Sequence, residues 1–270
     1  MKLATQLAAA ISLGMLSVAA FSDDHPAPAA EDGPACEGFG PQTPRDIDSK
    51  KGENPQHFPM APTYRDMNLC NIHLHVSAEH KAKAFAVSAG EGGHGGYQCT
   101  ISKKLTQAEL ATPAQEICKG LKPGDTIEVH WVYSSCQVKP GKGLESCLSD
   151  KCGNPGLRVE SQVFTLVNDK KALNFKDFDY QGQMVKGVHQ TKAIPTNTGK
   201  PVEFLGSTTG PKYSDAACSP LQVTWSIRPK CAKLDINSLG DWCMKNEFSE
   251  DHAHGVRKLV TNPKLLSQIK

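Results

Sequence analysis

The chain has 270 residues, enough for one large domain or two small ones, either of which can bury a hydrophobic core. Hydrophobic residues make up 39% and charged residues 21%, which is ordinary for a globular protein and excludes a disordered chain. The formal net charge of +2 is too small to indicate binding to nucleic acid or to an anionic membrane surface.

The N-terminal segment MKLATQLAAAISLGMLSVAA has the form of a secretory signal peptide. Lys2 precedes a short apolar stretch, and Val18 and Ala20 suit the −3 and −1 positions of a cleavage site. A membrane anchor is less favoured, because a spanning helix needs about 20 apolar residues. A Pro/Ala/Asp-rich stretch follows. We predict a signal peptide over 1–22, a disordered leader over 23–35 and one folded domain over 36–270.

Ten cysteines agree with export, because an even number of cysteines in an exported chain indicates disulfides. Their spacing does not suit a zinc ribbon, since Cys147 and Cys152 have no matching second pair. We therefore predict a secreted, periplasmic, disulfide-bonded protein.

Strand patterns dominate the folded part of the chain. Five segments alternate or run apolar and are bounded by Gly, Pro, Asn and Asp. We expect a mainly β fold with a few short helices. The predicted strands are 68–76, 125–134, 157–168, 202–207 and 221–228.

Two segments have helical features. Within 105–121, Thr106 and Glu109 form a capping-box pattern, although Pro113 interrupts the segment. A second short helix is expected within 254–269. The segment EDHAHG (250–255), which overlaps its start, is read as a polar loop.

The segment NIHLHVSAEHK (71–81) holds three histidines. On a strand, His73 and His75 point to the same side and are about 6.5–7 Å apart, within reach of a shared metal. His80 falls on the other face if the strand continues. We therefore expect it to support the metal ligands and not to bind the metal itself.

The third candidate ligand is His130 in DTIEVHWVYS, where a histidine between apolar neighbours is costly unless something satisfies it. Glu128 lies on the same face and can orient a metal-bound histidine by accepting its free ring proton. Three histidines without a fourth protein ligand describe an open, catalytic zinc site. The residues alone also allow a different interpretation, in which His73 and His75 are surface residues and His130 is a hydrogen-bonded core histidine.

These residues resemble the zinc pattern of the α-class carbonic anhydrases, His-x-His followed by Glu-x-His on a later strand. CEGFGPQTPRDID (36–48), SAEH (77–80), FLGSTTGP (204–211) and VTW (223–225) are similar to motifs of that class and follow in the same order. CNIHLHVSAEHK, DTIEVHWVYS and EDHAHGVRKLV look like the δ-class carbonic anhydrases or their bacterial relatives.

The resemblance implies a single domain built on a large, mostly antiparallel central β-sheet, as in the α class. It also implies reversible hydration of CO2 to bicarbonate and a proton by metal-bound hydroxide. Zinc is the implied metal, and cobalt or cadmium are substitutes.

The resemblance also implies roles for further residues. Thr209 would fix the hydroxide and Glu79 would fix Thr209, because FLGSTTGP aligns with the family motif without a gap only in that register. Val132 and Trp225 would line the CO2 pocket. His57 and His94 are candidates for the proton shuttle. The implied disulfide joins Cys36 to Cys218.

Two other functions remain open at this stage. A non-catalytic periplasmic metal-binding protein would close the site with a fourth ligand, such as His80, Glu79 or Cys70. A cupin-like oxygenase or hydrolase would use Glu79 as a metal ligand.

Overall fold

A computed structural model describes residues 36, 38–90, 95–210, 212–256 and 260–270. The predicted signal peptide (1–22), the predicted leader (23–35) and His94 lie outside these residues. Within the described ranges, no helix is both long enough and apolar enough to cross a membrane.

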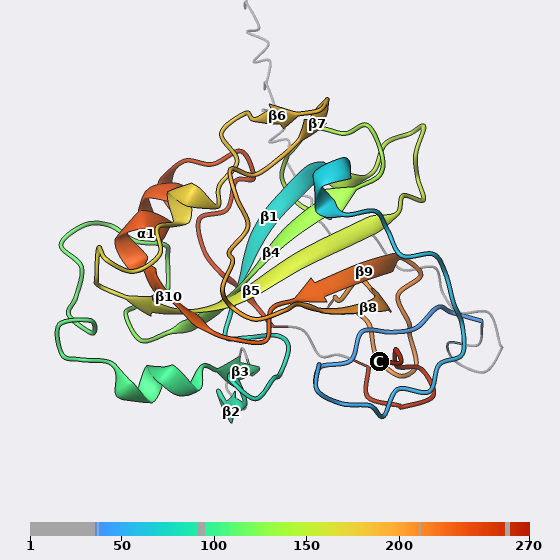
Figure 1. Cartoon of the computed structure of the whole chain (residues 1–270), viewed down its shortest axis with the longest axis horizontal. Helices are drawn as coiled ribbons and strands as arrows, with labels where there is room; N and C mark the ends of the chain where they lie inside the picture. Colours follow the sequence, from blue (N-terminus) through green and yellow to red (C-terminus); the bar gives the residue numbers. More distant parts are fainter. Residues whose placement is uncertain (1–35, 37, 91–94, 211, 257–259) are drawn as a thin grey trace, which may run out of the picture.

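The centre of the described structure is a β-sheet of seven strands. Six of them follow in the order β11-β1-β4-β5-β9-β8, and β10 pairs with β5. Figure 1 shows β1, β4 and β5 side by side in this sheet. The strands are β1 (Asn68–Val76), β4 (Thr126–Ser134), β5 (Leu157–Val167), β8 (Val202–Ser207), β9 (Gln222–Ile227), β10 (Ala232–Asp235) and β11 (His254–Gly255).

Antiparallel pairing makes up the larger part of the sheet. The antiparallel pairs β1/β4, β4/β5 and β8/β9 are each longer than the parallel pairs β5/β9, β5/β10 and β1/β11. All five segments predicted as strands lie in this sheet. The expected mainly β fold with a mostly antiparallel central sheet is therefore confirmed.

Shorter elements surround the sheet. Two hairpins pair β2 (Val87–Ser88) with β3 (Tyr97–Gln98), and β6 (Met184–Val185) with β7 (Val188–His189). The 3-10 helices are η1 (Tyr64–Asp66), η2 (Thr100–Lys104), η3 (Leu144–Cys147) and η4 (Phe175–Asp177).

The helix expected within 105–121 does not form. The capping contacts are present, because the backbone N–H of Thr106 donates to Glu109 Oε2 at 2.8 Å, and the N–H of Leu110 donates to the Thr106 carbonyl at 3.1 Å. The turn ends there, since Pro113 has no N–H to continue it. Glu109 Oε2 keeps its contacts with Thr106, while its Oε1 forms an ion pair with Lys233.

The second helix prediction is also wrong, since residues 254–255 form β11 and 263–265 form a turn. The sequence analysis missed α1 (Ile236–Met244). Its N-cap is Asp235, whose side chain accepts from the N–H of Asn237 at 3.2 Å. Gly240 allows close packing, because a Cβ there would lie 2.8 Å from the Glu116 carbonyl oxygen.

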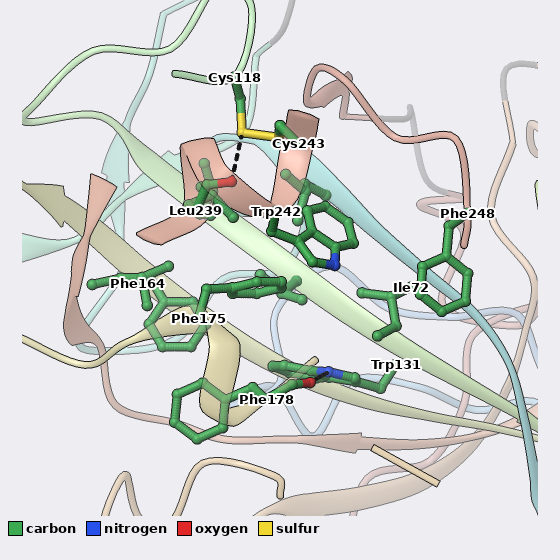
Figure 2. Packing of buried hydrophobic residues seen from close by; sticks show 14 of the residues in the cluster. Ile72, Cys118, Trp131, Phe164, Phe175, Phe178, Leu239, Trp242, Cys243 and Phe248 are labelled. Atoms are coloured by element: carbon green, nitrogen blue, oxygen red, sulfur yellow. Dashed lines mark hydrogen bonds between the residues drawn. A yellow bond between two sulfur atoms is a disulfide. The ribbon is translucent and has the colours of Figure 1, made fainter. Parts of the chain in front are cut away.

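The two faces of β1 have different surroundings, because successive strand residues point to opposite sides. Ile72 and Leu74 belong to a buried apolar cluster that includes Trp131 and residues of α1. Figure 2 shows Ile72 and Trp131 in this cluster. His73 and His75 face the other side. A slip of one residue would turn both histidines into the apolar cluster, so the packing fixes their register.

Five disulfides join all ten cysteines. Such a number indicates a protein that works outside the reducing cytosol. One bond joins Cys36 to Cys218, the pair expected from the family resemblance. The others are Cys70–Cys147, Cys99–Cys231, Cys118–Cys243 and Cys136–Cys152.

Candidate metal centre

Three histidines of the candidate site come from two neighbouring strands. In the antiparallel pair β1/β4, His73 lies opposite His130, and His75 lies opposite Glu128. Residues directly opposite each other share a face of the sheet, so all three histidines lie on one side. His75 and His130 are buried, and His73 is partly exposed.

The three imidazole rings converge. Their centroids are 5.0 Å apart for His73 and His130, 5.2 Å for His73 and His75, and 4.9 Å for His75 and His130. One ring nitrogen from each lies within 4.8 Å of the others. His73 Nε2 and His130 Nδ1 are 3.2 Å apart, close to the separation of about 3.3 Å between two ligands of a tetrahedral zinc ion.

Asn71 decides which nitrogen of His73 faces the centre. Asn71 Nδ2 donates to the Gly141 carbonyl at 3.0 Å, which fixes the amide so that Oδ1 lies 2.7 Å from His73 Nδ1. An amide oxygen only accepts, so His73 Nδ1 carries the proton and the Nε2 lone pair points to His130. The sequence analysis missed Asn71, although its place two residues before His73 on the strand was a signal.

Glu128 orients His130 in the same way. Glu128 Oε1 accepts from His130 Nε2 at 3.0 Å, from His80 Nδ1 at 2.8 Å and from Ser161 Oγ at 2.6 Å. Burial opposes the charge of Glu128, but His80 and His130 outweigh it and hold the pKa of Glu128 well below its usual value. The ionised carboxylate only accepts, so the His130 Nδ1 lone pair faces His73. Ser161 was missed, because nothing in its strand distinguishes it.

These residues fit a metal ion. Two lone pairs, on His73 Nε2 and His130 Nδ1, face each other across 3.2 Å. Both ring nitrogens of His75 are buried without a hydrogen-bond partner among the described residues, and Glu79 Oε2 is 3.5 Å from His75 Nδ1. Buried nitrogens without partners are costly. A cation between the three rings would bind one nitrogen from each ring, including one of the two His75 nitrogens.

The metal-free protein should lose stability in mild acid because of His75. Burial lowers the pKa of His75 to about 4, although Glu79 opposes the shift. Between pH 6.5 and pH 4 the unfolded chain binds a proton that the folded chain does not, so the free energy of unfolding should fall as the pH falls. The loss should reach roughly 3 kcal/mol. Urea unfolding of the wild type and His75→Gln from pH 7 to pH 4 measures it, and equal pH slopes would contradict this account.

Thr209 and Glu79 form a second pair beside the histidines. Thr209 Oγ1 donates to Glu79 Oε1 at 2.9 Å. Burial raises the pKa of Glu79, but His75, His130 and His80 outweigh this and lower it overall. The Thr209 oxygen is therefore left to accept a hydrogen bond from the cavity. The Thr208 hydroxyl oxygen instead lies 2.6 Å from the Ser219 hydroxyl oxygen.

The N-terminal segment holds the loop that carries Thr209. Thr43 Oγ1 donates to the Ser207 carbonyl at 2.7 Å and accepts from the Ser207 N–H at 3.0 Å. Gly206 allows this approach, because a Cβ there would lie 2.6 Å from Thr43 Oγ1. The disulfide Cys36–Cys218 ties the same two segments together. Two motifs far apart in the sequence thus support one loop.

A cavity of about 420 Å³ opens over the three histidines. Val132 and Trp225, the residues expected at the CO2 pocket, line it, and the Trp225 ring lies 5.2 Å from the His130 ring. Other apolar side chains extend this wall, so one side of the cavity suits an uncharged molecule. They are Leu144, Leu157, Val159 and Val223.

A further histidine lines the same cavity. His254 was read as part of a polar loop, but it lies in β11 opposite His75 and its Nε2 is 2.8 Å from Glu250 Oε2. The shuttle candidates are placed differently. His57 is exposed and does not line this cavity, and His94 lies outside the described residues.

Comparisons with known proteins place these residues in context. The sequence model described as delta carbonic anhydrase matches residues 64–238, more than half of the chain. Among solved structures, the chain is similar to the Photobacterium profundum alpha-carbonic anhydrase, with 15% sequence identity, coverage of 84% of this chain and 91% of that chain, and a TM-score of 0.25. No curated protein was found to match the chain.

Proposed function

Because the chain belongs to the delta carbonic anhydrase family, we propose that it catalyses the reversible hydration of CO2 to bicarbonate and a proton. His73, His75 and His130 hold one zinc ion in this proposal, and cobalt or cadmium can replace it, as three imidazoles accept several metals. The observation that carries the proposal is the convergence of three ring nitrogens at the floor of a cavity.

Zinc, when bound, supplies a water acidic enough to be hydroxide near neutral pH. The chain's own residues orient the attack. Thr209 donates its proton to Glu79, so its oxygen would be left to accept a hydrogen bond from the hydroxide that bound zinc would supply and would orient it toward the apolar wall. CO2 has no charge, and Val132 and Trp225 offer it an apolar surface. His57 and His94 remain the proposed shuttles for the released proton.

The alternative, a non-catalytic periplasmic metal-binding protein, needs a fourth protein ligand. Cys70 is bonded to Cys147. His80 directs Nδ1 to Glu128, and Glu79 accepts from Thr209. Among the described residues, no fourth side chain joins the group formed by the three histidines. An open fourth position favours the enzyme over the metal-binding protein. A cupin-like oxygenase or hydrolase would need Glu79 as a metal ligand, and Glu79 is not part of the three-histidine group.

We propose a periplasmic location. The N-terminal residues 1–22 have the pattern of a signal peptide, and the five disulfides support an oxidising compartment.

Glu128→Ala should weaken zinc binding by roughly 10–100-fold, since His130 and His80 lose their common acceptor. Glu128→Gln is the matched variant, because it keeps an oxygen acceptor while removing the charge, and it should fall between the alanine variant and the wild type. Zinc affinity is measured by competition with a chromophoric chelator. If Glu128→Ala binds zinc as tightly as the wild type, the carboxylate does not support the site.

The proposed function is tested by stopped-flow CO2 hydration with the purified protein in three states. These are the metal-free protein, the protein loaded with one zinc per chain, and the zinc-loaded protein after a zinc chelator is added. The account predicts hydration only in the loaded state and its loss on chelation. A zinc-loaded protein with no hydration above the buffer rate would contradict the proposal.

A further inference from the structure

β1 carries a bulge beside the first histidine. Its register with β4 shifts between Leu69 and Asn71, so Cys70 is an extra residue without a partner on β4. A bulge leaves backbone groups outside the ladder and turns the neighbouring side chains in new directions. This one lies three residues before His73.

One loop at the edge of the cavity binds the groups that the bulge leaves free. The Cys70 carbonyl accepts from the Gly141 N–H at 3.0 Å and from Ser146 Oγ at 2.7 Å. The Cys70 sulfur is bonded to Cys147, and both cysteines are buried. We call residues 139–147 the rim loop, because residues 142–145 line the cavity.

Asn71 connects the rim loop to His73. Its Nδ2 donates to the Gly141 carbonyl, and its Oδ1 accepts from His73 Nδ1. We propose that Asn71 and the disulfide Cys70–Cys147 act together as a clamp that positions His73 to bind the metal. They are positioning residues, and the inference rests on the proposed function because it takes His73 as a ligand.

The reason is the freedom of an imidazole ring. The terminal torsion of histidine is broad, so a ring without a partner samples several orientations and both neutral tautomers. Asn71 removes that freedom only while its own amide is fixed by Gly141. Gly141 is in turn fixed by the bonds of the rim loop to Cys70. Loss of a hydrogen-bond partner behind a metal ligand typically costs 10–100-fold in affinity.

The first test is Asn71→Leu, which keeps the branched shape of the side chain without its polar groups and leaves every disulfide in place. We expect zinc affinity to fall by roughly 10–100-fold, and ¹⁵N NMR of the metal-free protein should show His73 losing its single Nδ1–H tautomer. Asn71→Asp retains an oxygen acceptor for His73, so it should restore the tautomer. A purely structural role for Asn71 would not produce this rescue.

The second test compares two disulfides of the same region. Cys70→Ser/Cys147→Ser should weaken zinc binding by about tenfold. Cys136→Ser/Cys152→Ser removes a bond between two cysteines that lie outside both β1 and the rim loop, and it should leave zinc binding near the wild-type value. Adding Asn71→Leu to the first pair should weaken binding little further, because coupled residues are not additive. If Cys70→Ser/Cys147→Ser does not fold, Ser146→Ala takes its place. This variant keeps the disulfide but removes the hydrogen bond from Ser146 to the Cys70 carbonyl, and it should weaken zinc binding measurably.

The outcomes separate the two proposals. Wild-type zinc affinity and an unchanged His73 tautomer in Asn71→Leu would overturn the clamp. A wild-type protein that binds no zinc would overturn the proposed function, and the tautomer of His73 in the metal-free protein would still decide the clamp.

Discussion

His130→Ala should bind no zinc at micromolar concentrations and should lose measurable CO2 hydration. Two histidines cannot hold zinc as three do, and the lost ligand is the one that Glu128 orients from behind. The substitution also leaves Glu128 buried without one of its donors, so the variant must first be shown to fold by its circular dichroism and thermal unfolding. Zinc content after dialysis and stopped-flow hydration then give the result.

The matched control is His252→Ala. His252 is also a histidine, but its side chain is exposed and pairs with Asp251 rather than with the three-histidine group. It should keep one zinc per chain. If His130→Ala retained stoichiometric zinc, the metal would be bound elsewhere and the assignment of the three histidines would be wrong.

Thr209→Ala should lower kcat/KM by roughly 10–100-fold, or about 1.4–2.8 kcal/mol of barrier, while zinc content stays near one per chain. The substitution removes the acceptor for the attacking hydroxide without touching a histidine. It also leaves Glu79 without the donor at 2.9 Å. Thr209→Ser keeps the hydroxyl and should recover most of the rate.

Two further variants sharpen the test. Thr208→Ala is the neighbouring control, because the Thr208 hydroxyl lies beside Ser219 and not beside Glu79; its effect should be mild. Glu79→Ala should resemble Thr209→Ala, and the double variant should be little worse than either single one, because the two residues act as a unit. Full activity in both Thr209→Ala and Glu79→Ala would rule out this pair as part of the reaction.

The strands could be predicted because their signal is local. Alternation in 68–76 and 202–207 gave the observed bounds of β1 and β8, since one face of each strand meets an apolar cluster. The helices were predicted less accurately than the strands. Thr106 and Glu109 form their capping contacts, but a cap does not extend a helix that Pro113 interrupts. In α1, the apolar spacing was present but Gly240 lowers the helical propensity.

The candidate site was only partly visible in the sequence. The same-face pairs His73/His75 and Glu128/His130 follow from strand geometry, and the register of β1 with β4 brings them together. Asn71 lies two residues before His73 on β1, but its amide is fixed by a bulge and by the rim loop, which are tertiary features. His254 reaches the cavity because β11 adds to the edge of the sheet beside β1. Pairing of distant strands has no local sequence signal.

The most direct test of the central claim is a crystal structure of the zinc-loaded protein with anomalous diffraction data collected on both sides of the zinc absorption edge. The account predicts one peak per chain, bound by His73 Nε2, His130 Nδ1 and one ring nitrogen of His75 at about 2.0–2.1 Å, with the fourth position open to the cavity. A peak bound by a fourth protein side chain, or a peak away from these three histidines, would contradict it.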